Sequence, residues 1–135
     1  MSDPDLPCLC ILTRQVSRKL TAVYDEALAP TGINIAQFSL LRKLRRYGPS
    51  SLSALASLAD LDRSTLGRNL RVLEKMNLVA LIPGKDKRES VAALTDQGAQ
   101  TIKAGDPIWD RTQDEIANKI GSTGIGQLQA MLEQL

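Results

Sequence analysis

Histidine is absent from this sequence of 135 residues, and cysteine occurs only as Cys8 and Cys10. Without histidine, a chain cannot build the Ser-His or Cys-His pairs that activate a nucleophile in many enzymes. A single C-x-C pair is too small for a classical zinc site, and two cysteines are too few for a disulfide framework. We therefore expect a protein that is not an enzyme and has no metal or cofactor.

Aromatic residues and long apolar runs are also scarce. One Trp, one Phe and two Tyr leave Leu, Ile, Val and Ala to form the core. No segment approaches the roughly 20 apolar residues of a membrane span, and residues 1–10, MSDPDLPCLC, lack the basic start and apolar run of a secretory signal. The length fits one domain, so we expect a cytoplasmic protein with no membrane partner.

Charge is distributed unevenly along the chain, although the net charge is only +2. Residues 31–94 hold 11 basic and 5 acidic side chains, whereas residues 1–30 hold 3 and 4 and residues 95–135 hold 3 and 6. A basic centre between two acidic ends favours a central segment that meets a polyanion, with flanking segments that have another task.

The first half of the chain has the periodicity of helices. After Pro7, apolar residues recur every three or four positions as far as Ala27, which predicts a helix of about five turns. APTGIN, at 29–34, ends it. A second helix is expected at 35–46, and a short helix follows a cap at Ser50 or Ser51. Asp60 and Asp62 enclose a tight turn, and Asp62 is the expected N-cap of the next helix.

The second half begins with a change to extended structure. LVALI (78–82) and SVAALT (90–95) predict two strands joined by a charged turn, which is a β-hairpin. Thr95 and Asp96 then cap a further helix, in which we expect a kink or break at Pro107. GSTGIG (121–126) is expected to be a loop or a frayed helix start, followed by a final amphipathic helix.

Helix, short helix, tight turn, helix and hairpin is the order of a winged helix-turn-helix, whose second helix enters the DNA major groove. On a helical wheel of residues 63–75, Leu66, Leu70 and Leu73 form one stripe. The opposite face carries Ser64, Arg68, Arg71 and Lys75. Such a face is often merely solvated, but the preceding turn, the absence of acids on this face and the basic hairpin favour nucleic acid. Gly67 weakens the helix, and one explanation is close approach of the backbone to a partner.

Residues 51–98 resemble the core of MarR-family transcriptional regulators, and both flanking helical regions extend the resemblance over nearly the whole chain. The matching motifs are Asp62-Arg63-Ser64-Thr65, Leu73-Glu74-Lys75, Leu78-Val79, Asp86-Lys87-Arg88 and Leu94-Thr95-Asp96-Gln97-Gly98. Three features depart from the family pattern. The arginine that is common after the Leu-Val pair is absent from LVALI (78–82). Lys87 stands in place of an arginine and keeps only its charge, and Asn77 stands where glycine is common, although asparagine also accepts left-handed backbone.

The resemblance implies a mainly α-helical fold with a small β-hairpin wing, in which residues 31–95 form the DNA-binding domain. Residues 1–30 and 96–135 would supply the N- and C-terminal dimerisation helices. The long apolar faces of both end segments agree with this, because they would otherwise be exposed. The partners would be a second copy of the chain and a double-stranded, pseudo-palindromic DNA operator.

The same resemblance implies which residues contact DNA. Ser64, Thr65 and Arg68 would meet base edges, Arg71 or Lys75 would lean toward phosphate, and Arg88 would enter the minor groove or pair with Asp86. The full set of expected DNA-binding residues is Arg63, Ser64, Thr65, Arg68, Arg71, Lys75, Lys85, Lys87 and Arg88. The basic residues of the second helix are expected to be solvated or phosphate-facing; they are Arg42, Lys43, Arg45 and Arg46.

The signal that such a regulator would sense has two interpretations. Cys10 and Tyr24 match positions of the reactive cysteine and a tyrosine in the organic-peroxide-sensing branch of the family, a partial resemblance because Arg14 and Ile35 replace other tyrosines. Cys10 and Tyr24 would be about 21 Å apart in one helix, so contact requires the partner chain. Alternatively Cys10 is structural, and a small ligand binds between the dimer arms and the DNA-binding lobes, where Trp109 could line the pocket or belong to the core.

The whole chain is thus interpreted as a sequence-specific DNA-binding repressor, released from its operator by a small ligand or by oxidation of Cys10. Two other function classes stay open at this point. One is a winged-helix module that binds protein, and the other is a small thiol redox enzyme that uses Cys10. Salt-dependent binding to duplex DNA distinguishes the regulator from both.

Overall fold

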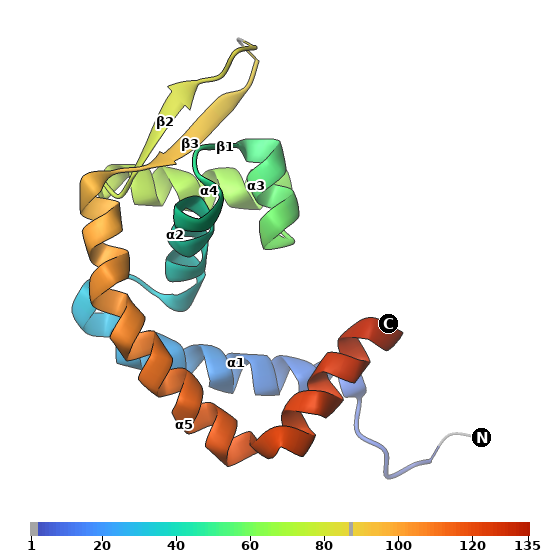
Figure 1. The fold of residues 1–135 in the computed structure, drawn as a ribbon. Coiled ribbons are helices and arrows are strands. Elements are labelled where there is room, and N and C mark those ends of the chain that lie inside the picture. Colours follow the sequence, from blue (N-terminus) through green and yellow to red (C-terminus); the bar gives the residue numbers. More distant parts are fainter. Residues whose placement is uncertain (1–2, 87) are drawn as a thin grey trace.

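The computed structural model describes residues 3–86 and 88–135, so Lys87 lies outside the described residues. Two parts are visible in Figure 1: a lobe that carries a projecting hairpin, and a pair of long helices below it. The elements are α1 (Leu9–Leu28), the short 3-10 helix η1 (Ala29–Thr31), α2 (Ile35–Tyr47), β1 (Ser50–Ser51), α3 (Leu52–Ala59), α4 (Arg63–Lys75), β2 (Val79–Pro83), β3 (Ser90–Leu94) and α5 (Asp96–Gln134). This order confirms the winged helix-turn-helix.

Local capping explains where the helices of the lobe begin. The side chain of Asn34 accepts a hydrogen bond from the backbone N–H of Gln37, whose own side chain accepts from the N–H of Asn34, which is a capping box. Ser51 caps α3 by accepting from the N–H of Ala54. Asp62 caps α4, as the sequence predicts.

Two positions outside the helices need left-handed backbone and have residues that tolerate it. Asp60, at the end of α3, has φ 52°, and Asn77, after α4, has φ 62°. Asparagine and aspartate adopt this region more readily than other non-glycine residues. Asn77 therefore performs the role that glycine has at this position in the family pattern.

The core of the lobe is aliphatic, with one phenylalanine at its centre. Leu66, Leu70 and Leu73 of α4 are fully buried, which confirms the predicted stripe. They pack with buried residues of the other elements, which include Leu28, Phe38, Leu41, Leu44, Leu55, Val79, Ala92 and Ile102. Burial of each large aliphatic side chain contributes roughly 1.5–3 kcal/mol. This core therefore holds α4 with one face inward and the opposite face outward.

The hairpin belongs to a three-stranded antiparallel sheet of order β1-β3-β2. Leu81 pairs with Ala92 in the β2–β3 ladder, and Ser50 of β1 also pairs with Ala92 on the other side. The two strands of the hairpin agree with the prediction to within a residue. The third strand was not predicted, because two serines carry no strand signal and pair only through their backbone.

The prediction for the last third of the chain was wrong at Pro107, where no break occurs. An interruption in the segment 121–126 was predicted correctly, but it is confined to Gly121 (φ 79°, ψ 163°), and helix geometry otherwise runs from Asp96 to Gln134. Proline removes one hydrogen bond from a helix. The turn of α5 before Pro107 contacts the lobe, and these contacts keep the helix continuous. Gly121 adopts backbone that is essentially restricted to glycine, and α5 turns sharply there (Figure 1).

Two glycines let α5 pass close to the lobe. A Cβ at residue 98 would lie 2.2 Å from the carbonyl oxygen of Leu78, and one at residue 105 would lie 2.7 Å from the Phe38 ring. Thr95 caps this helix by accepting from the N–H of Gly98, while its hydroxyl donates to the carbonyl of Asn77 at 2.7 Å. The start of α5 is thereby fixed to the end of α4 and to the sheet.

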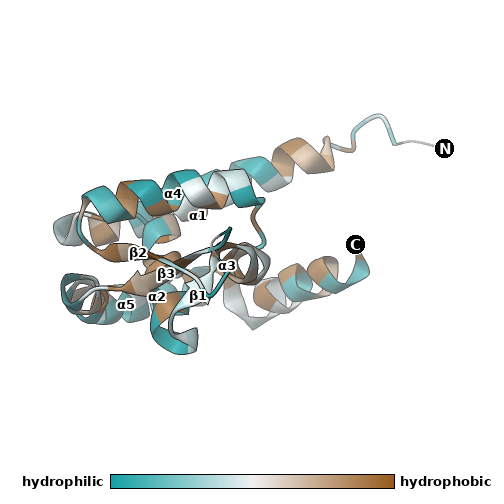
Figure 2. Cartoon of the chain, turned by 90° about the horizontal axis from the view of Figure 1, so that it is seen from above, coloured by the Kyte–Doolittle hydropathy of each residue, from teal (hydrophilic) through white to brown (hydrophobic). Residues whose placement is uncertain are grey.

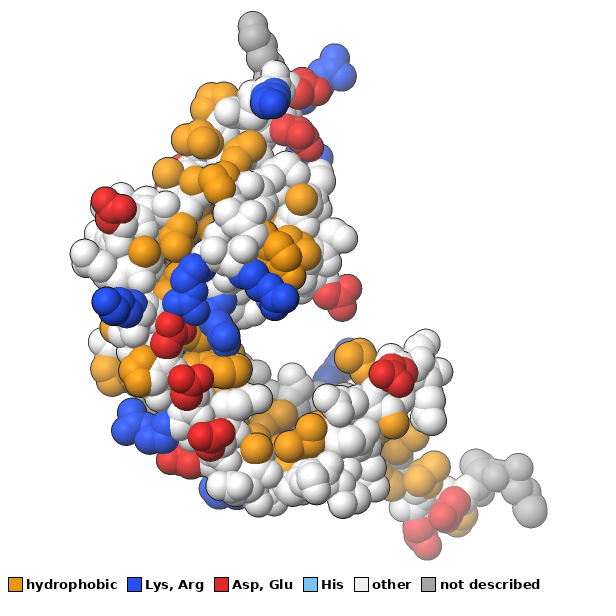
Figure 3. Space-filling view, in the orientation of Figure 1, with side chains coloured by type: hydrophobic (Ala, Val, Ile, Leu, Met, Phe, Trp, Pro, Cys, Tyr) orange, Lys and Arg blue, Asp and Glu red, His pale blue; other side chains and the backbone are white. Residues whose placement is uncertain are grey.

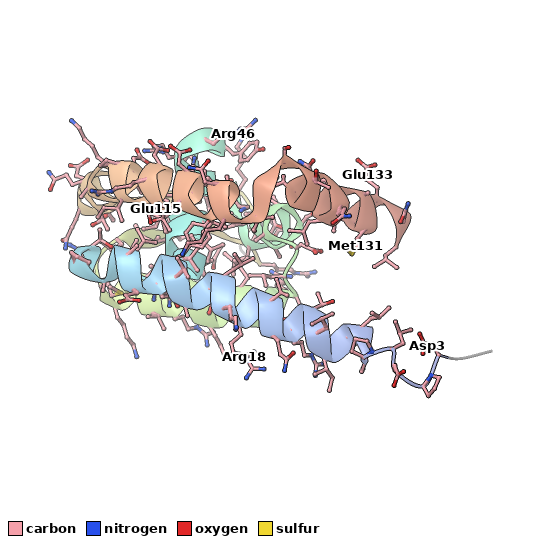
Figure 4. The ribbon with its side chains drawn as sticks, turned by 90° about the horizontal axis from the view of Figure 1, so that it is seen from below. Asp3, Arg18, Arg46, Glu115, Met131 and Glu133 are labelled. Carbon is pink, nitrogen blue, oxygen red and sulfur yellow. The ribbon has the colours of Figure 1, made fainter. Side chains whose placement is uncertain are left out.

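The two long helices, α1 and α5, pack side by side below the lobe (Figures 1 and 4). Arg18 projects from α1 away from α5 in Figure 4. Apolar side chains remain exposed on both, and brown bands recur along α1 and the end of α5 in Figure 2. They are Leu9, Ile11, Leu12, Val16, Val23, Leu128, Met131, Leu132 and Leu135. Among residues 3–86 and 88–135, no helix has both the length and the apolar character to cross a membrane.

Candidate nucleic-acid interface and an adjoining cationic cavity

The start of α4 is fixed by a cluster of hydrogen bonds around Asp62. Its Oδ1 accepts from the backbone N–H of Thr65 at 2.7 Å and from the hydroxyl of Ser64 at 2.9 Å, and its Oδ2 accepts from the hydroxyl of Thr65 at 3.0 Å. The bond from the Thr65 N–H, together with the two hydroxyl bonds, holds the pKa of the Asp62 carboxyl below its usual range. The hydroxyls expected to meet base edges are thus oriented by the cap.

The outward face of α4 is basic, as predicted. Arg63, Arg68, Arg71 and Lys75 are all exposed, and Arg68 donates to the Thr65 hydroxyl at 3.3 Å. Val72, 48% exposed, is the apolar residue among them. The structure therefore brings six of the expected residues together on α4, five of them exposed and Thr65 half-buried: Arg63, Ser64, Thr65, Arg68, Arg71 and Lys75.

Gly67 lies within the same helix and has helical backbone. In an α-helix, glycine costs about 0.8–1 kcal/mol relative to alanine. A Cβ built at residue 67 meets no atom within 4 Å. The fold of this chain would thus accept a larger residue there.

The wing turn carries the remaining basic residues. The N–H of Gly84 donates to the carbonyl of Glu89 at 2.7 Å and closes the turn. Lys85 and Arg88 are exposed. The expected pairing of Arg88 with Asp86 takes another form, because the backbone N–H of Arg88 donates to the Asp86 carboxylate at 3.2 Å.

A cavity of about 580 Å³ lies between the lobe and the long helices. The guanidinium carbon of Arg42 lies 4.2 Å from the centre of the Trp109 ring and 5.6 Å from that of Phe38. Arg42 is thus not simply solvated, as expected from the sequence, but is stacked on aromatic rings. The cavity is lined by Tyr24, Ile35, Phe38, Ser39, Arg42, Lys43, Arg45, Arg46, Tyr47, Leu58, Trp109 and Gln113.

Positive charge dominates this cavity. Figure 3 shows Lys and Arg side chains gathered beside the hollow, where α2 lies in Figure 1. Arg45 forms an ion pair with Asp106 of α5, with 2.6 Å between Nη1 and Oδ2. This hydrogen bond raises the pKa of Arg45 further. Among the described residues no other ion pair is present, so Arg42, Lys43 and Arg46 bring uncompensated charge to the cavity wall.

A pocket between the lobes and the long helices, with Trp109 as a lining residue, is one of the expectations from the sequence, but the basic lining of this cavity was not predicted. Arg42 and Trp109 are far apart in the chain, and only the packing of α2 against α5 brings them together. A cluster of four basic residues in 42–46 was the available signal, but the same pattern is typical of a solvated helix face. Trp109 is partly buried; it packs against the core and also lines the cavity.

The two cysteines and Tyr24 lie on α1 and just before it. Cys8 is the N-cap residue of α1 with extended backbone, and Cys10 lies in the first turn of the helix. Both thiols are free and exposed. The hydroxyl of Tyr24 donates to the side-chain oxygen of Gln113, and partial burial raises the pKa of Tyr24. In residues 3–86 and 88–135, no group of three or more metal-ligating side chains is present.

Comparison with known proteins gives a consistent result. Residues 33–90 match the model of the MarR family. The chain is 30% identical over 122 residues to the HTH-type transcriptional repressor NicR of Pseudomonas putida, a match that covers 90% of this chain and 75% of NicR. All four of the curated relatives found are HTH-type transcriptional regulators or repressors.

Solved structures agree over the same length. The chain is similar to the transcriptional regulator MosR of M. tuberculosis in complex with DNA, with 33% identity, a TM-score of 0.85 and 95% coverage of both chains. It also has the fold of a mutant of E. coli MarR complexed with operator DNA, with 24% identity, a TM-score of 0.83 and coverage of 93% of this chain and 91% of that one.

Proposed function

The chain belongs to the MarR family of transcriptional regulators, which bind DNA, and on that premise we propose that it is a cytoplasmic repressor with a pseudo-palindromic operator. A small ligand in the cavity, or oxidation of Cys10, releases it. Members of this family are not enzymes, so the interpretation as a thiol redox enzyme does not hold.

The exposed basic face of α4 carries the proposal for DNA. The buried leucine stripe turns Arg68 and Arg71 outward, and the Asp62 cap fixes the first turn. In this assignment Ser64, Thr65 and Arg68 read base edges in the major groove, because they lie at the helix start. Residues for phosphate, or for the minor groove at the wing, are Arg63, Arg71, Lys75, Lys85, Lys87 and Arg88.

A homodimer is the form in which the protein would bind. The exposed apolar side chains on α1 and at the end of α5 would be costly to leave in water, and a second copy offers the matching surface. A two-fold dimer would place its two α4 helices in half-sites about 10 base pairs apart.

The cavity supports control by a small anionic ligand. Arg42, Lys43 and Arg46 offer positive charge, and Trp109 offers an apolar face. Its walls come from α2 of the lobe and from α5 below it, so a bound ligand would change how the lobe is held. The lobe carries α4, and the position of α4 decides whether two half-sites can be reached together.

Oxidation of Cys10 is the other proposed signal, and it is supported by the exposure of the thiol at the start of α1. The thiolate would attack the terminal oxygen of an organic hydroperoxide. The O–O bond would break, the cysteine would become a sulfenic acid and the alcohol would leave. Tyr24 of the partner subunit could then hydrogen-bond the oxidised sulfur.

Binding to a duplex selected by the wild-type protein from a random-sequence pool tests the DNA proposal. Arg68→Ala should relax sequence specificity and weaken binding to the selected duplex by about 1–3 kcal/mol. Arg71→Ala should remove one phosphate contact, so the slope of log affinity against log salt concentration should fall in magnitude by about one. Arg18→Ala is the matched control, since Arg18 projects from α1 away from α5 (Figure 4). Unchanged binding of both α4 variants would refute the assignment, and binding without salt dependence would favour a protein-interaction module.

The two signals are separated by two further variants. A hydroperoxide should release wild-type protein from the duplex but not Cys10→Ser, and equal behaviour of the two proteins would exclude Cys10 as the sensor. For the cavity, an aromatic carboxylate such as benzoate serves as the probe. Release of wild-type protein that is lost in Arg42→Ala supports the ligand site, and release of both proteins at the same concentration refutes it.

A further inference from the structure

Gly67 is a glycine of the lobe that no contact within the chain explains. A Cβ would collide with a neighbouring element or turn at Gly84, Gly98 and Gly105, or with Ile120 of the same helix at Gly124, and φ is positive at Gly32, Gly48 and Gly121. Gly126, near the end of α5, likewise has helical backbone and open space, but it lies outside the lobe. Gly67 has helical backbone, and open space surrounds the position of its missing Cβ. Since glycine weakens a helix, its presence in the centre of α4 points to something outside the chain.

The neighbours of Gly67 show where that outside contact would be. On a helix surface, residues three and four positions apart lie side by side. Around Gly67 these are exposed Arg63 and Ser64 on the preceding turn, and exposed Arg71 and buried Leu70 on the following turn, so Gly67 lies at the border between the outward face and the leucine stripe. Gly67 is therefore a gap among the residues proposed to contact DNA, while buried Leu66 holds the adjacent side of the helix inside the lobe.

We propose that Gly67 is a specificity-determining residue, at which the backbone of α4 packs directly against base edges in the major groove. This inference rests on the proposed DNA-binding function. With no Cβ, the helix can approach the groove floor more closely by roughly the length of one C–C bond, about 1.5 Å. Ser64 and Arg68 then reach base edges that a more distant helix would miss. Longer side chains that bind phosphate, such as Arg71, adjust to either depth.

Alanine at this position has two effects of opposite sign, and the experiment measures both. Gly67→Ala should raise Tm by a few degrees, because helix propensity improves and nothing obstructs the new methyl group. Affinity for the duplex selected by wild-type protein should fall about tenfold or more. Affinity for a random-sequence duplex, and the salt dependence, should stay unchanged because phosphate contacts remain.

Asn69→Ala is the matched control. It improves helix propensity on the same helix, but residue 69 is two positions from Gly67 and faces another side of α4. This variant should bind the selected duplex as wild-type protein does. A similar loss in Asn69→Ala would show that helix propensity, and not the methyl group, causes the change, which would overturn the inference.

Two further results would also overturn it. Equal affinity of Gly67→Ala and wild-type protein for the selected duplex would show that the backbone does not approach the bases. An equal loss on the selected and random duplexes would place the contact at phosphate. If wild-type protein itself selects no sequence from the pool, the proposed DNA-binding function is wrong, and this inference is wrong with it. If wild-type protein selects a sequence but Gly67→Ala binds it equally well, only the inference about Gly67 is wrong.

Discussion

Arg45 on α2 and Asp106 on α5 form a two-pronged hydrogen-bonded ion pair, with 2.6 Å from Nη1 to Oδ2 and 3.0 Å from Nη2 to Oδ1. The pair joins the DNA-binding lobe to the long helix next to the cationic cavity. It also occupies one of the four basic residues of α2, so the cavity has less free positive charge than the sequence suggests. The contact is therefore relevant both to stability and to the charge that a ligand would meet.

We expect the Arg45–Asp106 pair to contribute modestly to stability. Both side chains are partly exposed, 42% and 34%, and solvent-exposed pairs are typically worth 0.2–1 kcal/mol. A double-mutant cycle with Arg45→Gln and Asp106→Asn, measured by urea unfolding, should give a coupling energy of about 0.2–1 kcal/mol. A coupling well above this range would show that the pair is shielded from water in solution, as dimer formation could do.

Gly98→Ala should destabilise the protein by about 1–3 kcal/mol, the usual cost of overpacking. The new methyl group would meet the carbonyl oxygen of Leu78, which belongs to the backbone and cannot rotate away. Urea unfolding measures the change. Gly67→Ala is the control, because the same substitution in open space should stabilise the protein. Equal stability of Gly98→Ala and wild-type protein would mean that α5 lies farther from Leu78 than in this structure.

The cap at Asp62 should make stability depend on pH in the acid range. Hydrogen bonds from Thr65 and Ser64 lower the pKa of Asp62 in the folded protein. The stabilisation is therefore fully present above the ordinary carboxyl pKa of about 3.9 and is lost as the pH falls through the lower folded-state pKa.

Asp62→Asn keeps a cap that does not titrate. The difference in Tm between wild-type protein and this variant should therefore shrink with acidification, and should do so only in that pH window. Asp62→Ala should lower Tm at neutral pH, because both the cap and the orientation of the Thr65 hydroxyl are lost. A difference that does not change with pH would contradict the shifted pKa.

Val16→Asp should dissociate the proposed homodimer. Val16 lies on the exposed apolar face of α1, 41% exposed in the single chain, and burial of an unpaired carboxylate in an interface is costly. Sedimentation velocity should show a single-chain species for the variant and a dimer for wild-type protein. Arg18→Ala, which removes a polar side chain that projects away from α5 (Figure 4), is the control and should stay dimeric. A monomeric wild-type protein would refute the proposal.

Features that depend on neighbours in sequence could be predicted from the sequence. The caps at Ser51, Asp62 and Thr95 and the stripe of Leu66, Leu70 and Leu73 are all local patterns, and the structure confirms them. These patterns were sufficient to identify α4 and its outward face. The resemblance to the MarR family then indicated that this outward face contacts DNA.

Features that depend on distant contacts were missed. Pro107 does not break α5, because the two residues directly before it are held against the lobe. Asp106 pairs with Arg45, and Gly105 packs against the Phe38 ring. The stacking of Arg42 on Trp109 likewise follows from how two helices cross, and neither residue carries a local signal for it. Helix propensity describes a residue apart from its tertiary contacts. The continuity of α5 at Pro107 and the position of Arg42 depend instead on packing between helices.

Gly121 has a consequence for the DNA that the protein selects. The direction of residues 122–134 depends on the backbone of this single glycine, and in the proposed homodimer that segment lies between the two subunits. We therefore expect the number of base pairs between the two half-sites to depend on residue 121, while the sequence of each half-site depends on α4. Selection of operators with Gly121→Ala should return the same half-sites with altered or less uniform spacing.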